Sequence, residues 1–465
     1  MLSKLFPFKI HLTILQLFEY NLVDFWRWIL QNVNSRGLEG KKMLTLTSKM
    51  RLIIALAFVW LVVLFILIGQ ASWLWAIIIS LVIFSQDYIL LSLALITLWP
   101  IENYIKSQIK SKTRNKIKKL QARGLKIIGI TGSYGKTTTK DFLYQILRTK
   151  YQVLKTPESF NTILGIAKVV DLELDESYQY FICEYGAFKK GSINELVDMV
   201  KPDFGILTGI NEQHLEQFGT IEDIIREKFA MIEVIDPKQP IVINLGNKYI
   251  TDHYKKFDQN YVCFGTSDST FHIPHSTFDE NSSKFDLILD GKKYLATTPV
   301  FGQSNLQNIL AAATMAYQLG ITPKQIIESI AYLKPTPHRL EVKQFKNGIT
   351  YIDNAFSSNV DGFKLALEFL KTFKKRPKIL VTPGIILLAD RAVEIHRELG
   401  ALASKICDRI ILVGKSERTK ALEEGANDIE KTIYIDKISE VWPTITSLDL
   451  KNPAVLIEND LPDNY

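Results

Sequence analysis

The chain has 465 residues, of which 47% are hydrophobic and 23% are charged, and its formal net charge is +7. A chain of this length and composition is typical of roughly two to four globular domains that carry some membrane segment. The three cysteines, Cys183, Cys263 and Cys407, are odd in number and far apart, which argues against a disulfide framework or a zinc cluster and indicates a reducing compartment.

Near the N-terminus, a long apolar run predicts membrane helices. No charged residue occurs in the range 52–86, and apart from Asp87 the apolar character continues well beyond it. The run is longer than one bilayer span requires, and it begins too late and is too long for a cleaved signal peptide. A turn at 69–72 divides it into a predicted hairpin of two transmembrane helices, about 52–69 and 73–99.

Two further features of this region have more than one interpretation. Residues 5–31 are rich in Leu, Phe and Trp but include Glu19, Asp24 and Arg27, so they suit an interfacial helix better than a third span. Asp87 either marks a functional path, as acids inside a membrane commonly do, or is a solvated acid in a locally broken or interfacial helix. We favour the solvated acid.

Basic residues flank the apolar run on both sides. They are Arg36, Lys41, Lys42, Lys49 and Arg51 before it, and Lys or Arg at 106, 110, 112, 114, 116, 118, 119, 123 and 126 after it. The positive-inside rule therefore places both ends of the hairpin in the cytoplasm. We expect the basic segment 103–126 to lie on anionic headgroups. The alternative, binding of RNA, is disfavoured by the membrane run that precedes the segment.

Residues 130–139, Ile-Thr-Gly-Ser-Tyr-Gly-Lys-Thr-Thr-Thr, predict a phosphate-binding loop between an apolar strand and a helix at 136–147. The glycines allow a tight turn that points N–H groups inward, and the helix N-terminus adds positive dipole. Lys136 supplies a mobile charge and Thr137 a hydroxyl for Mg²⁺. The nucleotide-binding candidates are Gly132, Ser133, Gly135, Lys136, Thr137 and Thr138. Because the usual pattern has glycine where Ile130 stands, this loop is a variant.

From Gly124 onward, strand-like and helix-like segments alternate, which predicts an α/β architecture with a mainly parallel sheet. The expected strands are 126–131, 178–184, 204–208, 240–244, 378–382 and 409–413. In such sheets ligands gather at the carboxyl ends of strands. Glu184 ends one strand and is either a Mg²⁺ ligand or a solvated acid. His214 follows the next strand and is a candidate metal ligand or substrate contact, although a lone loop histidine is usually neither.

Five ordered segments can be compared with a known family. They are 132–139 (GSYGKTTT), 184–187 (EYGA), 211–219 (NEQHLEQFG), 302–308 (GQSNLQN) and 338–341 (HRLE). Together they resemble the successive signatures of the Mur ligases, ATP-dependent amide-forming enzymes of peptidoglycan precursor and cell-wall synthesis that are related to folylpolyglutamate synthase. The second and third segments are most similar to the branch that adds D-alanyl-D-alanine to a UDP-muramoyl-tripeptide.

The resemblance implies that ATP phosphorylates a carboxylate to an acyl phosphate, which an amino acid or dipeptide then attacks. Positioning and charge neutralisation would dominate such chemistry. Lys136 would bind the β- and γ-phosphates, Thr137 one Mg²⁺, and Glu184 and His214 a second Mg²⁺. Lys228 stands where many members have a lysine that becomes a carbamate, an anionic Mg²⁺ ligand; the alternative is an ordinary helix-surface lysine.

The resemblance assigns further residues to the nucleotide and the substrate. Asn305 and Asn308 match asparagines near adenine, while Arg339 and Asp353 match residues of the C-terminal domain that reach toward phosphate and ribose. Arg339 would act only after domain closure, which excludes water from the acyl phosphate. The candidates on the substrate side are Ser159, Asn161, Thr162 and Asn359.

Two departures from the family concern the substrates. The segment 353–360, Asp-Asn-Ala-Phe-Ser-Ser-Asn-Val, replaces the usual Asp-x-Tyr-Asn-Ala-Asn-Pro, so the identity of the amine is in question. Members that use UDP-muramoyl substrates carry a soluble uridine-binding domain ahead of the phosphate loop, where this chain has the membrane hairpin. Either the nucleotide end of the acid is held differently or the acid is lipid-linked.

We therefore expect a monomeric multi-pass protein of the bacterial inner membrane, with ligase domains in the cytoplasm. It would contact membrane lipids and small-molecule substrates, but no nucleic acid. The expected parts are a membrane-anchoring region 1–123, a P-loop ATP-binding domain 124–334 and a Rossmann-like C-terminal domain 335–465. The alternatives are a ligase for another or lipid-linked acid, a membrane P-loop NTPase without ligase activity, and an inactive scaffold.

Overall fold

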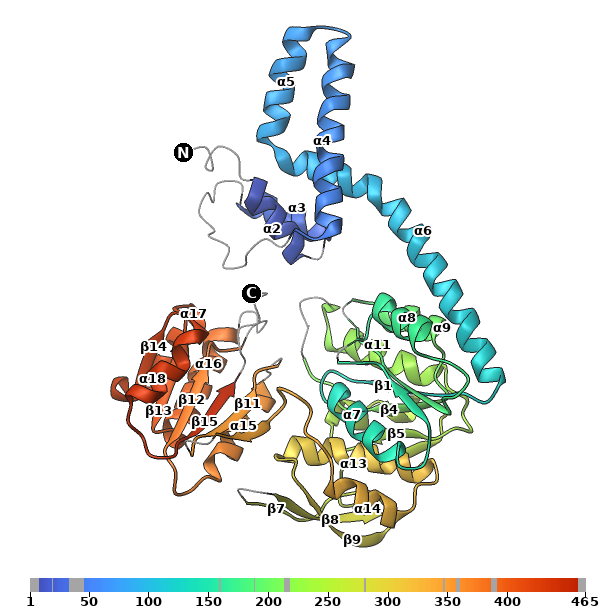
Figure 1. Ribbon diagram of the computed structural model, residues 1–465, viewed down its shortest axis with the longest axis vertical. Coiled ribbons are helices and arrows are strands. Elements are labelled where there is room, and N and C mark those ends of the chain that lie inside the picture. Colours follow the sequence, from blue (N-terminus) through green and yellow to red (C-terminus); the bar gives the residue numbers. More distant parts are fainter. Residues whose placement is uncertain are drawn as a thin grey trace. The chain divides into compact units, whose positions relative to one another are not determined.

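The computed structural model describes residues 8–18, 20–32, 46–158, 160–187, 189–212, 218–279, 282–345, 348–356, 360–385 and 391–458 (Figure 1). The chain divides into two compact units, with the boundary between Ile109 and Lys110. The unit that holds the phosphate loop therefore begins before the boundary predicted at Gly124. The reason is that the helix preceding the loop packs on this unit.

Helices build the first unit. They are α2 (Phe8–Leu17), α3 (Leu22–Asn32), α4 (Ser48–Gly69), α5 (Trp73–Ser85) and the first part of α6 (Asp87–Ala122). The helices α4 and α5 run side by side as a hairpin, which confirms the predicted turn at 69–72 (Figure 1). By length and composition, α4 and α6 could each cross a membrane, while α5 is a shorter apolar helix. The second predicted span, 73–99, is wrong as one helix, because the chain breaks at Gln86 with φ −110° and ψ 52°.

The N-terminal segment forms two helices instead of the single interfacial helix predicted for 5–31. The helices α2 and α3 are separated by a turn in which Tyr20 has φ 65°. Both pack with α4 and α6 in one apolar core, whose members include Leu15, Phe25, Ile53 and Leu91. The indole Nε1 of Trp26 donates to Ser92 Oγ at 3.0 Å, which fixes α3 to α6.

Asp87 begins α6, where the helix dipole favours an acid. Its side chain is buried, and Asp87 Oδ1 lies 2.7 Å from His11 Nδ1 of α2. The predicted solvated acid is therefore wrong. The helix is locally broken as that interpretation required, but the broken end is covered by α2.

The C-terminal part of α6 belongs to the second unit. Thr113, Ile117 and Leu120 are buried along one helical face, spaced as neighbours on successive turns. Lys116 Nζ donates to the carbonyl of Val170 at 2.6 Å and to that of Asp171 at 3.1 Å. These carbonyls end α8 (Ile163–Leu172), so Lys116 satisfies groups that a helix terminus leaves unpaired.

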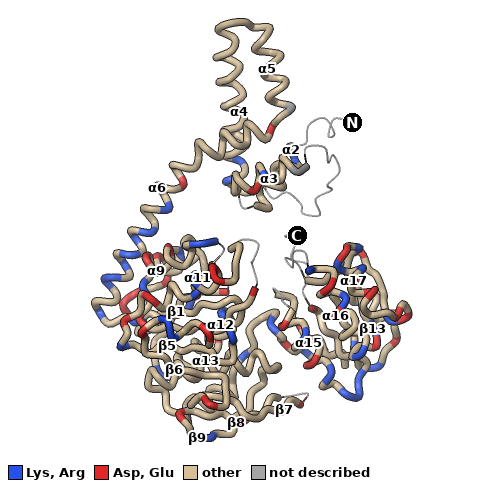
Figure 2. Tube along the Cα trace, turned by 180° about the vertical axis from the view of Figure 1, so that it is seen from behind, with Lys and Arg blue, Asp and Glu red and all other residues tan. Residues whose placement is uncertain are grey.

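Acidic side chains of the second unit pair with this part of α6. Lys112 Nζ lies 2.7 Å from Asp171 Oδ1, and Arg114 forms an ion pair with Asp198. Figure 2 shows the basic residues that recur along this part of the helix. The prediction that they lie on lipid headgroups is corrected for Lys112 and Arg114, because a protein surface supplies their counter-charges.

A six-stranded parallel sheet forms the core around the phosphate loop, in the order β2-β3-β1-β4-β5-β6. The strands are β1 (Lys126–Thr131), β2 (Val153–Lys155), β3 (Tyr180–Glu184), β4 (Phe204–Leu207), β5 (Ile241–Asn244) and β6 (Tyr261–Phe264). The four strands predicted in this region are confirmed. Since all neighbours are parallel, their carboxyl ends meet at one edge of the sheet.

Helices cover both faces of this sheet. The helices are α7 (Lys136–Leu147), α13 (Gln303–Gln318) and α14 (Pro323–Ala331) on one side, α9 (Ser192–Met199) and α11 (Ile221–Glu233) on the other, with α12 (Lys248–Thr251) and the 3₁₀ turn η1 (Tyr254–Lys256) near β5. Ile128 and Ile130 pack toward α7 and α13. Gly129, between them, faces α11, where a Cβ would lie 2.8 Å from Met231 Sδ.

A small antiparallel sheet of β7 (Ser276–Phe278), β8 (Ser283–Leu289) and β9 (Lys292–Thr298) packs against α13 and α14. The C-terminal sheet has the order β10-β11-β15-β12-β13-β14, and only the β10–β11 pair is antiparallel among its described strands. Its strands are β10 (Glu341–Gln344), β11 (Thr350–Asn354), β12 (Lys378–Thr382), β13 (Arg409–Val413), β14 (Thr432–Ile435) and β15 (Ala454–Glu458).

Helices lie on both faces of the C-terminal sheet, over two separate apolar clusters. They are α15 (Val360–Lys371), α16 (Ala392–Ile406), α17 (Glu417–Ala426) and α18 (Val441–Ser447), with the 3₁₀ turns η3 (Ile429–Lys431) and η4 (Ile438–Glu440). The predicted strands 378–382 and 409–413 and the α/β class are confirmed.

Candidate active site

The phosphate loop joins β1 to α7 at the carboxyl edge of the central sheet. Gly132 has φ 150°, and a Cβ there would lie 2.2 Å from Thr208 Oγ1. Gly135 has φ 77°, and a Cβ there would lie 2.5 Å from Asn308 Oδ1. Both positions require glycine, because the backbone angle and the close neighbours exclude a side chain.

The loop is tied to the segment that follows β4. Ser133 N donates to Gly209 O at 2.7 Å, and Ser133 Oγ accepts a hydrogen bond from Asn211 N at 3.2 Å. Thr138 is buried in the first turn of α7. These contacts fix the loop at the N-terminus of α7, where backbone N–H groups attract an anion.

Lys136 lies across this loop. Its Nζ donates to Gly132 O at 2.8 Å and to Ser133 O at 3.3 Å. Burial lowers the pKa of Lys136, the carboxylate of Glu184 opposes this, and the positive charges of Arg339 and Lys140 add to it. The predicted phosphate-binding lysine therefore lies among other charged groups.

Glu184, at the end of β3, accepts hydrogen bonds from three side chains. Thr137 Oγ1 donates to Glu184 Oε2 at 3.0 Å, Lys140 Nζ donates to the same oxygen at 3.1 Å, and Asn161 Nδ2 donates to Glu184 Oε1 at 3.1 Å. Burial alone would raise the pKa of Glu184, but the charges of Lys140 and Lys136 and these hydrogen bonds hold it below its ordinary value. Glu184 is therefore anionic and fixed, which excludes the solvated strand-end acid.

These groups fit a magnesium ion. The hydroxyl of Thr137 and the carboxylate of Glu184 are hard oxygen ligands on neighbouring elements, and Mg²⁺ prefers such ligands together with phosphate oxygens. Among the described residues no group of three or more His, Cys, Asp and Glu side chains could hold a metal ion. The predicted second ligand, His214, lies outside the described residues.

The segment between β2 and α8 carries the predicted substrate residues. Asn161 contacts Glu184. Its side chain also packs closely on Gly186, since a Cβ on Gly186 would lie 2.6 Å from Asn161 Cγ. Thr162 caps α8 by accepting a hydrogen bond from Gly165 N at 3.3 Å. Asn161 thus belongs to the site, whereas Thr162 positions the helix behind it. The other two substrate candidates, Ser159 and Asn359, lie outside the described residues.

Lys228 lies on α11 and is buried, so it is not an ordinary helix-surface lysine. Burial lowers its pKa to about 7, and the positive charge of Lys136 adds to this, while Glu227 and Glu184 oppose it. The neighbouring Glu227 accepts hydrogen bonds from the N–H groups of Gly191 and Ile193 at 2.7 and 2.6 Å, which caps α9. Lys228 is therefore an amine that is partly neutral near neutral pH.

The stability of the protein is expected to rise with pH because of Lys228. Its pKa is about 7 in the folded chain and 10.5 in the unfolded chain, so between these values the unfolded chain binds the proton more strongly. Raising the pH from about 7 to 8.5 should add about 1.6 kcal/mol of unfolding free energy. Denaturant unfolding of wild type and Lys228→Met at both pH values checks this: equal pH dependence in the two would contradict it.

Arg339 lies in the connection between the two sheets and is held by unusual backbone. The flanking residues His338 and Leu340 have φ 59° and 53°. Asn305 Nδ2 donates to Arg339 O at 3.4 Å, and the guanidinium lies 4.7 Å from the ring centroid of Phe356. Burial lowers the pKa of Arg339, and the charge of Glu184 opposes this. Arg339 therefore already lies within electrostatic reach of Glu184.

The remaining nucleotide candidates have protein partners. Asn308 Oδ1 accepts a hydrogen bond from Thr139 Oγ1 at 3.2 Å, which sets α13 against the phosphate loop. Asp353 is buried, lies 2.8 Å from His338 Nδ1 and accepts a hydrogen bond from Ala355 N at 3.2 Å. In this structure Asp353 thus steadies the connection beside Arg339. Contacts of these residues with adenine and ribose stay predictions.

Two family models match the chain across this site. The Mur ligase middle domain matches residues 130–316, and the Mur ligase glutamate ligase domain matches residues 338–457. The chain belongs to the Mur ligase family. The two matched ranges of this Mur ligase hold the parallel sheet with the phosphate loop and the C-terminal sheet, in the order that the motifs predicted.

Two relatives of this Mur ligase are enzymes of the same name. The UDP-N-acetylmuramoyl-tripeptide–D-alanyl-D-alanine ligase of Bacillus subtilis is 29% identical over 299 residues, which cover 64% of each chain. The enzyme of the same name from Mycobacterium bovis is 28% identical over 317 residues, covering 66% of this chain and 62% of the relative. The chain thus spans slightly less than two thirds of the length of these curated relatives.

Solved structures support the same fold. The MurF crystal structure from Acinetobacter baumannii superposes with a TM-score of 0.67 at 26% identity, covering 76% of this chain and 77% of that one. The MurF ligase from Thermotoga maritima in complex with ADP has a TM-score of 0.69 at 24% identity, covering 76% and 80%.

The sequence motifs of this Mur ligase did not reveal Lys140 and Asp141. Lys140 contacts Glu184, and Asp141 accepts a hydrogen bond from Thr336 Oγ1 at 3.0 Å near Arg339. A signal was present for Lys140, since it stands one turn after Lys136 on the face of α7 that Thr137 also occupies. Asp141 carried no such signal, because its partner is distant in the sequence.

Proposed function

We propose that the protein is an ATP-dependent ligase that activates a carboxylate as an acyl phosphate and joins it to an amine. One observation carries this proposal: at the end of the parallel sheet, the fixed anion Glu184 accepts a hydrogen bond from Thr137 and acts electrostatically on the cations Lys136 and Arg339. The described site offers cations and hard oxygen ligands, as a transferred phosphoryl group requires, and activates no side chain as a nucleophile.

In this proposal each residue neutralises or positions a reacting group. Lys136 and the N–H groups at the start of α7 bind the β- and γ-phosphates of ATP, and Arg339 binds the phosphoryl group as it moves to the substrate carboxylate. Thr137 and Glu184 would hold Mg²⁺, which neutralises phosphate charge. Asn161 donates to Glu184 Oε1, the carboxylate oxygen that Thr137 does not contact, and it would contact the substrate acid. The amine then attacks the acyl carbon and phosphate leaves.

For the substrates, we propose a muramoyl-peptide acid and D-alanyl-D-alanine, in peptidoglycan precursor synthesis. The relatives from Bacillus subtilis and Mycobacterium bovis, which are UDP-N-acetylmuramoyl-tripeptide–D-alanyl-D-alanine ligases, support this choice. The full chain, with ATP and acid, should release phosphate only when the dipeptide is added. Parallel assays with a UDP-linked and a lipid-linked acid distinguish the two possible carriers. Release of phosphate that is independent of any amine would instead favour an NTPase.

We also propose that Lys228 carries a carbamate in the active protein. Carbamate formation needs a neutral amine, and burial lowers the pKa of Lys228 to about 7 near the charges of Lys136 and Glu184. Carbon-13 bicarbonate should therefore give a carbamate signal in the NMR spectrum above about pH 7, and the signal should be absent in Lys228→Met. A spectrum without this signal in the wild type would exclude the modification.

A membrane anchor is the second part of the proposal. The helix α4 is long and apolar enough to cross a membrane. Large apolar side chains of the hairpin are exposed, such as Phe58 of α4 at 65% and Trp73 of α5 at 67%. Apolar surface of this extent is unusual in water and suits a lipid environment. We propose that the hairpin holds the protein in the inner membrane with its catalytic unit in the cytoplasm.

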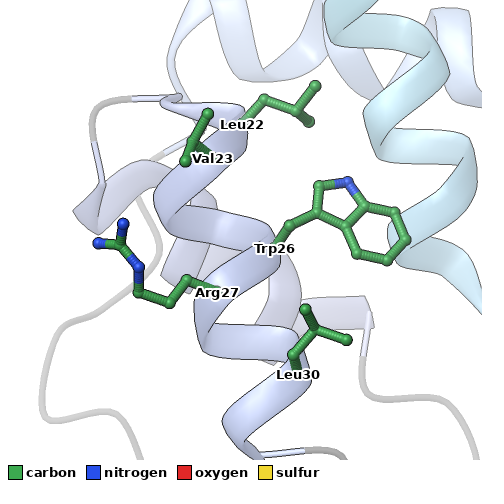
Figure 3. A pocket seen from close by; sticks show the side chains of 5 residues that line it. All are labelled: Leu22, Val23, Trp26, Arg27 and Leu30. Atoms are coloured by element: carbon green, nitrogen blue, oxygen red, sulfur yellow. The ribbon is translucent and has the colours of Figure 1, made fainter.

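The helix α3 would add an interfacial contact. Leu22, Val23, Trp26, Arg27 and Leu30 line a shallow groove on it, and Figure 3 shows Arg27 and Trp26 on different sides of the helix. Val23 and Leu30 are 67% and 71% exposed. Such a helix lies with its apolar side chains at the headgroup boundary. The full chain should remain in membranes after alkaline carbonate washing, and release by carbonate would contradict the anchor.

A further inference from the structure

Lys140 is a buried lysine whose role the phosphate loop does not explain. Its side chain is 0% exposed, and its Nζ lies 3.1 Å from Glu184 Oε2. The same Nζ donates a hydrogen bond to the backbone carbonyl of Glu158. Lysine is almost never fully buried unless its charge is paired, so the ion pair with Glu184 is what permits Lys140 to be buried. From this position Lys140 holds both Glu184 and the carbonyl of Glu158.

The backbone of Glu158 has a conformation that needs support. Its φ is 41°, in the left-handed region that residues with a Cβ seldom adopt. The side chain of Glu158 is exposed, so the contact with Lys140 involves the backbone carbonyl. A strained conformation persists only where the surrounding structure holds it. The hydrogen bond from Lys140 is such a restraint.

The turn at Glu158 leads directly to Asn161. Asn161 Nδ2 donates to Glu184 Oε1, while Lys140 Nζ donates to Glu184 Oε2. Glu184 N in turn donates to Thr156 Oγ1 at 3.3 Å, at the start of the same loop. Lys140 therefore contacts both Glu184, at the end of β3, and the loop that brings Asn161 to Glu184.

We propose that Lys140 is a positioning residue that couples the loop 156–162 to Glu184. Through this coupling, Asn161, which would contact the substrate acid, and Glu184, which lies beside the phosphate loop, are positioned together. Lys140 acts through Glu158 and Glu184 and touches neither substrate. The kinetic part of this inference rests on the proposed function, whereas the structural part does not.

Hydrogen exchange of the full chain without substrates tests the structural part. In Lys140→Met, peptides that cover 156–162 should exchange roughly tenfold or more faster than in the wild type, because the turn loses its restraint. Adding Glu158→Gly should restore much of the protection, since glycine adopts a positive φ without strain. Glu158→Gly alone should leave the exchange unchanged. An unchanged loop in Lys140→Met, or no restoration by glycine, would overturn the inference.

Kinetics test the coupling to the substrate. Lys140→Met should lower kcat/KM for the acid by roughly 100-fold while the KM for ATP changes little, because Lys136 and its loop are intact. Glu158→Gly should recover part of this loss. Lys150→Met is the matched control, since Lys150 also donates to a carbonyl, Gly320 O at 2.8 Å, away from the site. If Lys140→Met changed the KM for ATP as much as it changed kcat/KM for the acid, the coupling would be overturned.

A second substitution keeps the test valid if Lys140→Met does not fold. Lys140→Gln retains donors on a shorter side chain, so it should show a smaller loss of protection that Glu158→Gly again reduces. Failure of the proposed function is distinguishable, because the wild type would then form no amide while the exchange results still hold. Failure of the present inference would leave wild-type activity intact.

Discussion

Replacing Lys136 by alanine is expected to lower kcat for amide formation by roughly 100- to 1,000-fold, the loss typical of one preorganised charge at a developing anion. The Nζ of Lys136 donates only to Gly132 O and Ser133 O among its described hydrogen bonds. The fold should therefore lose no more than about 1 kcal/mol of stability. Single-turnover assays and thermal unfolding of the full chain in detergent measure the two effects.

The matched control for this substitution is Lys150→Ala. Lys150 lies just after α7 and donates to Gly320 O, outside the site. It should retain wild-type activity. If Lys136→Ala kept more than about a tenth of wild-type activity, the loop would not bind the reacting phosphates as proposed.

Glu184→Gln should have the second large effect, because it acts on both stability and activity. The substitution leaves Lys140 buried, 0% exposed, without its anion. Removing one partner of a buried ion pair costs about 3–5 kcal/mol. Activity should also be lost, since Thr137 and Asn161 both donate to this carboxylate. Thermal unfolding and phosphate release measure the two losses separately.

The double variant Lys140→Met with Glu184→Gln separates the two roles of Glu184. Removing both charges replaces an ion pair by uncharged groups, which is often neutral for stability. The double variant should therefore be more stable than Glu184→Gln alone but remain inactive. Recovery of activity together with stability would show that Glu184 only neutralises Lys140.

Local sequence patterns were sufficient for the elements that build the phosphate loop. The apolar run before Gly132 and the helix 136–147 match β1 and α7, because strand burial and helix initiation depend on neighbouring residues. Glu184 was found for the same reason: it ends an apolar strand of a parallel sheet. The motif order then identified Arg339, although its electrostatic reach to Glu184 emerges only from the fold.

Features that depend on distant partners were predicted less well. The basic side chains of α6 resembled a headgroup-binding segment until Asp171 and Asp198 proved to be their counter-charges. Asp87 looked solvated because its partner His11 is far away in the sequence. Lys140 has the composition of a surface residue, and only the packing of α7 against β3 buries it. The sequence pattern placed Lys140 on the same face of α7 as Lys136 and Thr137, but it did not identify the partner of any of these side chains.

Transfer of oxygen from the acid to phosphate tests the central claim most directly. The full chain would receive ATP, D-alanyl-D-alanine and an acid whose terminal carboxylate is labelled with oxygen-18. Activation as an acyl phosphate predicts that the released phosphate carries one labelled oxygen, because the amine displaces the whole phosphate group from the acyl carbon. Unlabelled phosphate, with both labelled oxygens retained on the acid, would contradict carboxylate activation and indicate hydrolysis of ATP by water.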